Sequence, residues 1–572
     1  MASRRSLSDF VRRLLKNGSA IWSRTAAVFP IEQWFRFVDQ YHTCPRTPGR
    51  VKLASMRYCL IAGFAVGLAF AAGLRANIDP KNFDPAAKPQ ADFYEFASGG
   101  WIKANPVPAA YSSWGAFDEV DEHNKIALHQ ILENAAKADH RSRIEQQVGD
   151  FYASGMDETA IEAAGITPLQ PELDRLAKIT TITDVQAAIA RLHRIRVNAG
   201  FFFTAEQDPK NSVMMIATGG QAGLGLPDRD YYFRDDDKSK LLREQYVAHV
   251  ARMLELAGDP LAATQAEARA VMKLETALAK GSKTEVELRD PVANYHKMPQ
   301  ADLQKLTPRF DWKAYFAGLG LAQPGEIDVG QPEFIGAFDA ALSATPIADW
   351  QAYLRWHLIH AAAPCLNAAV VNENFDFFGR KLTGRQQLRD RWKRVLETVD
   401  GGIGAVIGHE MTHGFDDEGR QFDAHGNLTD WWSPECAARF KERSQAIVKQ
   451  FSAYVAIDDL HINGELTQGE NIADLGGVKL GYAALQKALA GQPRAAVEGY
   501  TPEQRFFLSW ATVWHESVRP EAARLQVNTD PHSPAQFRVN GPLSNLAEFA
   551  AAFNVPEGAA MRRPAGERVV IW

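Results

Sequence analysis

The chain has 572 residues, of which 46% are hydrophobic, and a formal net charge of −6. A single hydrophobic core does not extend over a chain of this length, so the sequence predicts at least two globular domains. This net charge is that of an ordinary protein surface, and no Lys/Arg block of the kind that follows a nucleic acid backbone is present, so we expect no nucleic acid partner. Four scattered cysteines are too few for a disulfide framework or a cysteine-based zinc site.

An apolar run without a charge lies at residues 58–74, with an arginine on each side. Its length falls between that of a signal-peptide core and that of a minimal membrane span. On one interpretation, residues 56–76 are a signal peptide that starts at Met56, and the basic extension 1–55 is absent from the mature protein. On the other, residues 1–55 are a basic cytoplasmic tail and residues 58–74 attach the protein to a membrane. Both interpretations predict export, to the periplasm or the extracellular space.

The N-terminal half of the folded region is expected to be mostly helical. Residues 77–89 are rich in Asp, Asn, Pro and Lys, which is typical of a linker, and folding is expected to begin near Asp92. Two β-favouring runs, 200–204 and 212–216, flank a polar turn and predict one hairpin as a minor element. Apolar residues at three- and four-residue spacing predict amphipathic helices over 118–136, 143–155 and 183–197.

The segment that most clearly indicates a metal site is His409-Glu410-Met411-Thr412-His413. Residues four apart lie on one face of an α-helix, so His409 and His413 can present imidazole nitrogens to a single ion. Glu410 lies beside them, where its carboxylate can act as the general base toward an attacking water. Such a string arises by chance on the order of 0.02 times in a chain of this composition. The pattern therefore predicts a zinc site rather than a pair of solvated histidines.

A catalytic zinc ion takes three protein ligands and leaves one position open, so a third ligand is needed. The metzincin pattern requires a glycine and a histidine at positions that Asp416 and Gly419 occupy, which excludes that branch. Residues 467–470 resemble a capping box that opens a helix, on which Glu470 and Asp474 share one face. Glu470 is the expected third ligand, and Asp474 is expected to accept the second ring N–H of a ligating histidine.

Two segments resemble the zinc motifs of the neprilysin-type zinc peptidase family, which includes endothelin-converting enzyme and bacterial oligopeptidases. These segments are Val406-Ile407-Gly408-His409-Glu410-Met411-Thr412-His413-Gly414-Phe415-Asp416-Asp417 and Glu470-Asn471-Ile472-Ala473-Asp474-Leu475-Gly476-Gly477. Further similarity lies at residues 92–101, 226–232, 530–541 and 571–572. The resemblance extends over residues 84–572.

The resemblance implies a mainly α (α+β) fold in two parts. Residues 401–572 would form a thermolysin-like zinc catalytic domain, and residues 84–400 a larger helical N-terminal domain that encloses a peptide cavity. The expected substrates are short oligopeptides, and the expected cofactor is one Zn²⁺ per chain. The implied roles are zinc ligation by His409, His413 and Glu470, water activation by Glu410, orientation of a ligand by Asp474, oxyanion stabilisation by His532, and binding of a substrate carbonyl by Arg538.

The chain departs from the family before the zinc helix. Family members have a long segment between the regions that match 391–395 and 401–404, and here only residues 396–400 intervene. The missing part includes an Asn-Ala-x-Tyr or Asn-Ala-x-Phe strand whose edge pairs with the bound peptide, and such pairing positions a substrate for attack. This departure favours a second hypothesis: a catalytically impaired zinc-binding remnant that acts at most as a peptide- or partner-binding protein.

Overall fold

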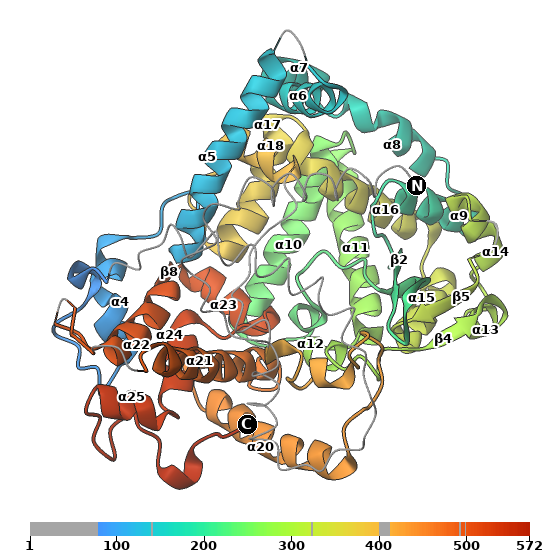
Figure 1. The fold of residues 1–572 in the computed structure, drawn as a ribbon. Coiled ribbons are helices and arrows are strands. Elements are labelled where there is room, and N and C mark those ends of the chain that lie inside the picture. The colour runs from blue at the N-terminus through green and yellow to red at the C-terminus, as the bar shows by residue number, and fades with distance from the viewer. Residues whose placement is uncertain are drawn as a thin grey trace. The chain divides into compact units, whose positions relative to one another are not determined.

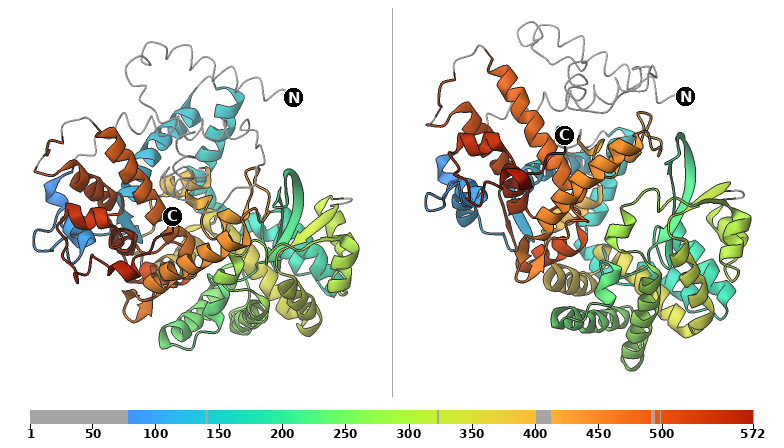
Figure 2. Two further views of the ribbon diagram at one scale, coloured as in Figure 1. Left: turned by 60° about the horizontal axis from the view of Figure 1, so that its bottom comes forward. Right: turned by 90° about the horizontal axis from the view of Figure 1, so that it is seen from below.

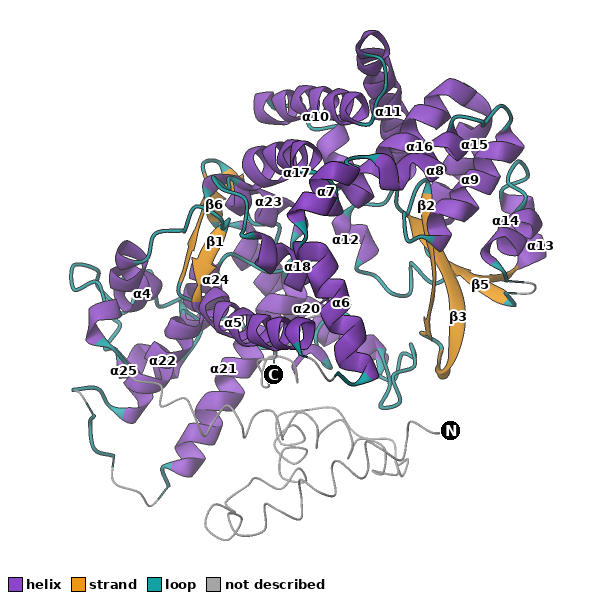
Figure 3. Cartoon of the chain, turned by 90° about the horizontal axis from the view of Figure 1, so that it is seen from above, coloured by secondary structure: helices purple, strands orange, loops and turns teal. Residues whose placement is uncertain are grey.

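The computed structural model describes residues 78–571, apart from 139–140, 322–323, 400–411, 491–493 and 498. Helices make up most of this part of the chain, and its strands are few (Figure 1, Figure 3). The mainly α fold class predicted from the sequence is confirmed. The described residues belong to one compact unit by their contacts, and the predicted division into 84–400 and 401–572 stays a prediction.

The helices predicted near the start of the folded region are present. Helix α4 (Phe93–Ala104), which was not predicted, begins after Asp92, because the Asp92 side chain accepts a hydrogen bond from the backbone N–H of Glu95 and caps the helix. The three predicted amphipathic helices follow with similar bounds, and two short helices lie between the second and the third: α5 (Ala116–Lys137), α6 (Arg143–Met156), α7 (Glu158–Ala164), α8 (Gln170–Leu176) and α9 (Ile182–Arg194).

Residues 78–89, the described part of the predicted linker, are folded, so the linker prediction is wrong there. Residues Pro80–Asn82 form a 3₁₀ turn that the Asp79 side chain caps. Phe83 is buried, and its ring stacks on that of Phe96 with 5.5 Å between centroids. The polar residues that suggested a linker instead cap turns, and the segment packs against α4.

The predicted hairpin is present and is longer than expected. Strand β2 (Phe201–Asp208) pairs antiparallel with β3 (Asn211–Gln221), and Figure 2 shows this hairpin as a long ribbon. It belongs to a four-stranded sheet of order β2-β3-β5-β4, in which β5 (Glu326–Val329) runs parallel to β3 and antiparallel to β4 (Lys297–Pro299). The sheet was not foreseen, because β4 and β5 are too short to show a period of two.

The largest apolar core lies around the central helices. It buries large aromatic side chains completely, including those of Trp350, Trp356 and Phe338, and each such burial stabilises the fold by roughly 2–3 kcal/mol or more. The helices of this region are α10 (Asp237–Leu256), α11 (Leu261–Gly281), α12 (Glu285–Leu288), α13 (Gln300–Leu306), α14 (Trp312–Leu319), α15 (Pro332–Ala344), α16 (Ile347–Ala362), α17 (Ala368–Asn374) and α18 (Arg391–Val399). A π-helical stretch, η5 (Phe375–Lys381), follows α17 directly.

The C-terminal region is also helical and contacts the start of the folded chain. It contains α20 (Pro434–Ser452), the short pair β6 (Val455–Ile457) and β7 (Leu460–His461), α21 (Gln468–Ala488), α22 (Pro502–Val513), β8 (Glu516–Val518), α23 (Pro520–Thr529), α24 (Ala535–Leu543) and α25 (Ala547–Ala552). Strand β8 pairs antiparallel with β1 (Ser113–Gly115). In addition, Asn540 accepts a hydrogen bond from the Tyr94 backbone N–H at 2.9 Å and donates one to Asp92 at 2.8 Å. Segments more than 400 residues apart are thereby held together.

The predictions for the N-terminus lie outside the described residues. These are the basic extension 1–55, the signal peptide 56–76 and the membrane attachment through 58–74. Within the described part of the chain, no helix is both long and apolar enough to cross a bilayer.

Candidate metal centre

Helix α21 carries Glu470 and Asp474, as predicted, but it does not begin with a capping box. The Thr467 side chain makes no cap hydrogen bond. Its hydroxyl donates to the Asn463 carbonyl at 3.1 Å and accepts from the Asn471 amide at 2.9 Å. The Glu470 carboxylate lies near two histidines and an arginine instead of returning to the helix N-terminus. The capping-box interpretation is therefore wrong, although the helix start that it predicted is right.

His413 faces two carboxylates. Its Nδ1 atom lies 2.7 Å from Oδ2 of Asp416, and its Nε2 atom lies 3.4 Å from Oε1 of Glu470. The other Asp416 oxygen accepts hydrogen bonds from the backbone N–H groups of Glu418 and Gly419, at 2.9 and 2.7 Å. Asp416 is thus fixed by the backbone, and it in turn fixes the His413 ring with Nε2 directed toward Glu470.

The spacing of these two groups fits a shared zinc ion. Two donors that each lie about 2.0–2.1 Å from a tetrahedral zinc ion are roughly 3.4 Å apart, which is the separation between Nε2 of His413 and Oε1 of Glu470. A ring nitrogen held by a carboxylate is also the usual arrangement behind a zinc-binding histidine. His409 and Glu410 lie outside the described residues. Among the described residues alone, no group of three or more His, Cys, Asp or Glu side chains is arranged to hold a metal ion.

His532 lies at the same carboxylate. Its Nε2 atom is 3.2 Å from Oε2 of Glu470, and its Nδ1 atom is 2.7 Å from Oδ1 of Asp530. Burial alone would raise the pKa of Asp530, but hydrogen bonds from the ring and the backbone N–H of His532 outweigh it and lower that pKa. An ionised Asp530 favours a proton on Nδ1 of His532. The His532 side chain is 44% exposed, so it borders solvent beside Glu470.

Arg538 joins the two carboxylates of α21. Its guanidinium donates to both oxygens of Asp474, at 2.8 and 3.0 Å, and lies 3.4 Å from Oε2 of Glu470. The guanidinium also stacks over the Trp514 ring at 3.9 Å from its centroid. Burial would lower the pKa of Arg538, but the charge and hydrogen bonds of Asp474 outweigh it and raise that pKa. Arg538 therefore stays charged beside both carboxylates.

Asp474 was predicted to accept the second ring N–H of a zinc-binding histidine, and this geometry tests that role for His413 only. For His413, the carboxylate on the second ring nitrogen is Asp416, which the sequence reasoning did not propose. A hydrogen bond from His409 to Asp474 stays a prediction, because His409 lies outside the described residues. The position of Asp416 three residues after His413 is a detectable signal in retrospect, but an acidic residue at that spacing is too common to single out.

Arg289, which directly follows α12, links the two segments that carry His413 and Glu470. Its guanidinium lies 3.1 Å from Oδ2 of Asp417 and 3.0 Å from Oε1 of Glu418. The same group donates to the Leu466 carbonyl at 2.6 Å, four residues before Glu470. A Cβ atom on Gly469 would lie 2.8 Å from this guanidinium, so a larger residue there would displace the Arg289 side chain. No local pattern around Arg289 predicts this contact.

The predicted site residues in the described part of the chain therefore converge. His413 comes from one segment and His532 and Arg538 from another, and all three approach the carboxylate of Glu470, which is 9% exposed. A helical protein with a histidine and a carboxylate at zinc-ligand spacing, and with polar side chains beside them, has the construction of a metallopeptidase.

Comparisons with known proteins identify the family. Two models described as peptidase family M13 match residues 89–422 and 397–569. These matches span most of the chain, and the chain belongs to peptidase family M13. The neprilysin-like resemblance predicted from the sequence is confirmed, and the family supports a zinc metallopeptidase function.

Individual relatives agree with this result. The chain is 27% identical to endothelin-converting enzyme 1 of Homo sapiens, over 86% of this chain and 85% of that one. Its structure resembles the crystal structure of a Mycobacterium tuberculosis zinc metalloprotease, ZMP1, in complex with an inhibitor, with a TM-score of 0.82, 29% identity, and coverage of 86% and 99% of the two chains. PepO from Lactobacillus rhamnosis shares the fold, with a TM-score of 0.74 at 18% identity and coverage of 85% and 100%.

The alignment with the human relative also bears on the length of this chain. It runs over 669 residues, which is more than the 572 residues that this chain contains. The alignment must therefore include stretches of the relative that have no counterpart here. This agrees with the expectation that the chain is internally shorter than other family members.

Proposed function

We propose that this chain is a zinc-dependent endopeptidase that hydrolyses short oligopeptides. The observation that carries the proposal is the 3.4 Å separation between Nε2 of His413 and the Glu470 carboxylate, because it suits two ligands of one zinc ion. His409 is proposed as the third ligand on the strength of its position four residues before His413 in the sequence.

The residues around the proposed metal site have different roles in hydrolysis. When bound, zinc acts as a Lewis acid, which makes an attacking water more acidic and polarises the substrate carbonyl. Glu410 takes the proton of the water and passes it to the leaving amine. His532 is proposed to act as an imidazolium, in which Nδ1 donates to Asp530 and Nε2 donates to the negative charge that develops on the carbonyl oxygen.

Arg538 and Asp474 are proposed to keep this arrangement rigid. The paired hydrogen bonds between them hold the guanidinium 3.4 Å from Glu470, and a rigid carboxylate needs no reorganisation during the reaction. Arg538 is also proposed to bind a substrate carbonyl. Location outside the cytoplasm rests on the apolar run 58–74 and belongs to the proposal as well.

Product mapping tests the proposal. The purified chain, loaded with zinc, is incubated with short peptides and with an unfolded protein, and the fragments are identified by mass spectrometry. We expect cleavage at internal bonds of the short peptides, inhibition by phosphoramidon, and loss of cleavage when a chelator removes the metal. Removal of single residues from one peptide end, or cleavage that persists in the chelator, would argue for a different enzyme.

A matched pair of variants links cleavage to the metal. Glu470→Gln should lower both the bound zinc and the cleavage rate, because a neutral amide is a weak zinc ligand. Glu465→Gln, which changes an exposed carboxylate five residues earlier, should lower neither. Metal analysis gives the zinc content of each variant, whether or not the protein is active.

The second candidate function is a zinc-binding protein with impaired turnover. It is favoured by the alignment that exceeds the length of this chain, since a missing edge strand would leave the peptide poorly positioned. Stoichiometric zinc together with peptide binding and no cleavage would support this candidate over the first.

A further inference from the structure

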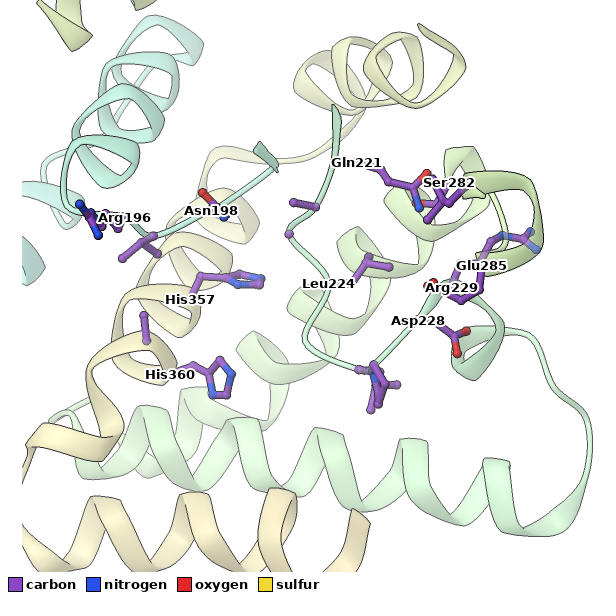
Figure 4. Close-up of a pocket in the computed structure, with 17 residues that line it drawn as sticks. Arg196, Asn198, Gln221, Leu224, Asp228, Arg229, Ser282, Glu285, His357 and His360 are labelled. Atoms are coloured by element: carbon purple, nitrogen blue, oxygen red, sulfur yellow. The ribbon is translucent and has the colours of Figure 1, made fainter. Parts of the chain in front are cut away.

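A cavity of about 420 Å³ is lined by residues of α16 and of the loop after β3 (Figure 4). Charged side chains of both signs line it, including those of Arg196 and Glu285, so its charge does not indicate one class of ligand. Two buried polar residues outside this cavity, Asn471 and Ser533, also have no role in the chemistry described so far. Their position beside the metal centre assigns them one.

Asn471 and Ser533 each directly follow a residue of the metal centre. Asn471 follows Glu470 on α21, and Ser533 follows His532 in the segment between α23 and α24. The Ser533 hydroxyl donates a hydrogen bond to Oδ1 of Asn471 at 2.8 Å. Ser533 is 1% exposed and Asn471 is 0% exposed. A hydrogen bond that is shielded from water is strong, so this bond links the segments that carry Glu470 and His532.

The Asn471 side chain is itself held in one orientation. Its Nδ2 atom donates to the Thr467 hydroxyl at 2.9 Å, and that hydroxyl donates to the Asn463 carbonyl at 3.1 Å. Because the Thr467 hydroxyl gives its proton to this carbonyl, it can only accept from Asn471. The amide nitrogen must therefore face Thr467, which directs Oδ1 toward Ser533.

The segment that carries His532 is short and stiff. Prolines lie on both sides of the pair His532 and Ser533, and a proline fixes its own φ and confines the residue before it to extended conformations. Asp530, which precedes the first proline, has a φ of −100° and a ψ of 131°, as expected. A shift of Ser533 is therefore passed on to the His532 ring. The bond to Asn471 thus sets where this ring lies relative to α21.

Helix α21 is attached to the segment of His413 by other contacts. A Cβ atom on Gly476 would lie 2.6 Å from Cγ2 of Thr412, so the helix and this segment are in close contact there. Thr412 directly precedes His413. The separation of the proposed zinc ligands on these two elements therefore does not depend on Ser533. A change at Ser533 should move the His532 ring and leave zinc binding unchanged.

We propose that Asn471 and Ser533 are positioning residues that align His532 with the substrate carbonyl. This inference rests on the proposed function, because it explains how the ring that stabilises the oxyanion is held in place. The hydrogen bonds of Arg538 with Asp474 attach α24 to α21 as well, so the chain stays folded when the Ser533 hydroxyl is removed. An oxyanion is stabilised only by a donor at hydrogen-bond distance, and a small displacement of the ring is enough to lose that contact.

Inhibitor binding tests the proposal without turnover. Phosphoramidon has a tetrahedral phosphoryl group whose oxygens resemble those of the attacked carbonyl, whereas the thiol inhibitor thiorphan binds a metal through its sulfur alone. Calorimetry gives the dissociation constants of both for the zinc-loaded 572-residue chain and for its Ser533→Ala variant. Ser533→Ala should weaken phosphoramidon binding about tenfold, because one hydrogen bond to a charged group is lost, and should leave thiorphan binding unchanged. Metal analysis should find equal zinc in both proteins.

A double-mutant cycle separates alignment of His532 from a general structural effect. His532→Ala removes the ring itself, so it should weaken phosphoramidon binding, and adding Ser533→Ala to it should cause no further loss. Ser444→Ala is the matched control, because Ser444 is also buried and its hydroxyl donates only to the Lys441 carbonyl of its own helix, α20, at 3.1 Å. This control should change the binding of neither inhibitor. Circular dichroism checks that each variant is folded.

Three results would overturn the proposal while leaving the proposed function in place. One is unchanged binding of phosphoramidon by Ser533→Ala. Another is an equal loss of both inhibitors in that variant, which would indicate a structural effect. The third is a loss from Ser533→Ala that adds in full to the loss from His532→Ala. A zinc-loaded wild-type chain that binds neither inhibitor would instead refute the proposed function, and the positioning role with it.

Discussion

At the scale of single residues, the orientation of His413 depends on Asp416. The Asp416 carboxylate lies 2.7 Å from Nδ1 of the ring and is itself held by two backbone N–H groups. A carboxylate in this position fixes the tautomer of the imidazole and strengthens it as a ligand. The zinc affinity of the site should therefore depend on a residue that does not bind the metal.

Replacing Asp416 by asparagine tests this dependence. Asp416→Asn should weaken zinc binding by about 10–100-fold, because the amide supports the ring less well than a carboxylate. The affinity is measured by competition with a zinc-binding dye. Asp459→Asn, an exposed change between β6 and β7, is the matched control. Equal affinities in the two variants would mean that Asp416 has no part in orienting His413.

The site residues differ in how far the sequence predicts them. His409, Glu410 and His413 follow from spacing alone, because two histidines one helical turn apart face the same ion. Glu470 follows from the need for a third ligand and from the helix pattern around it, whereas His532 and Arg538 follow from the family resemblance. The structure brings these three together. Trp514 and Asp416 were not foreseen, since a stacked ring and an acidic residue three positions away have no distinctive local signature.

At the scale of elements, Arg289 connects the end of α12 to the segments around His413 and Glu470. Its contacts with Asp417, Glu418 and the Leu466 carbonyl span both segments. Burial raises the pKa of Glu418 to about 7, with Arg289 opposing the shift. Arg289 is therefore positioned to set the distance between the two segments that are proposed to bind zinc.

Arg289→Lys should lower the peptide cleavage rate while the chain stays folded. Lysine retains the charge but cannot donate in several fixed directions, and a displacement of about 1 Å at a catalytic site can cost as much as about 100-fold in rate. Steady-state kinetics and thermal unfolding are measured together. Arg175→Lys, at an exposed position, serves as the control. An unchanged rate for Arg289→Lys would exclude the positioning role.

The pairing of β1 with β8 predicts a pH dependence of stability. Burial raises the pKa of Glu516, at the start of β8, from 4.5 to about 7. The folded state therefore keeps a proton that the unfolded state releases, and stability is lost as the pH rises from about 4.5 to about 7. Glu516→Gln should reduce this loss, as measured by the melting temperature across that range. An identical pH profile in both proteins would show that Glu516 does not contribute.

Local periodicity explains which elements were predicted. The helices over 116–137, 143–156 and 182–194, and the hairpin of β2 and β3, have apolar patterns that a short window reveals. Strands β1 and β8 have three residues each and pair across some 400 positions, so no local pattern can reveal them. The linker prediction failed because Asp and Pro also occur at caps and turns.

At the scale of the whole molecule, membership of the family supports peptidase activity, whereas the shorter length of the chain favours impaired activity. Membership of peptidase family M13 supports a zinc metallopeptidase, whereas an alignment longer than the chain indicates that parts of the relatives are absent here. The geometry around Glu470 favours an assembled metal centre. Peptide hydrolysis at that centre is the central prediction for the molecule.

The most direct test is the rate at which the purified, zinc-loaded chain cleaves an internally quenched short peptide, compared with Glu410→Gln. We expect cleavage by the wild-type chain and a decrease of at least about 100-fold in the variant, because the general base is lost. Both proteins should bind one zinc ion, since Glu410 is not a ligand. Equal rates in the two proteins, or no cleavage by a wild-type chain that holds its zinc, would contradict the account.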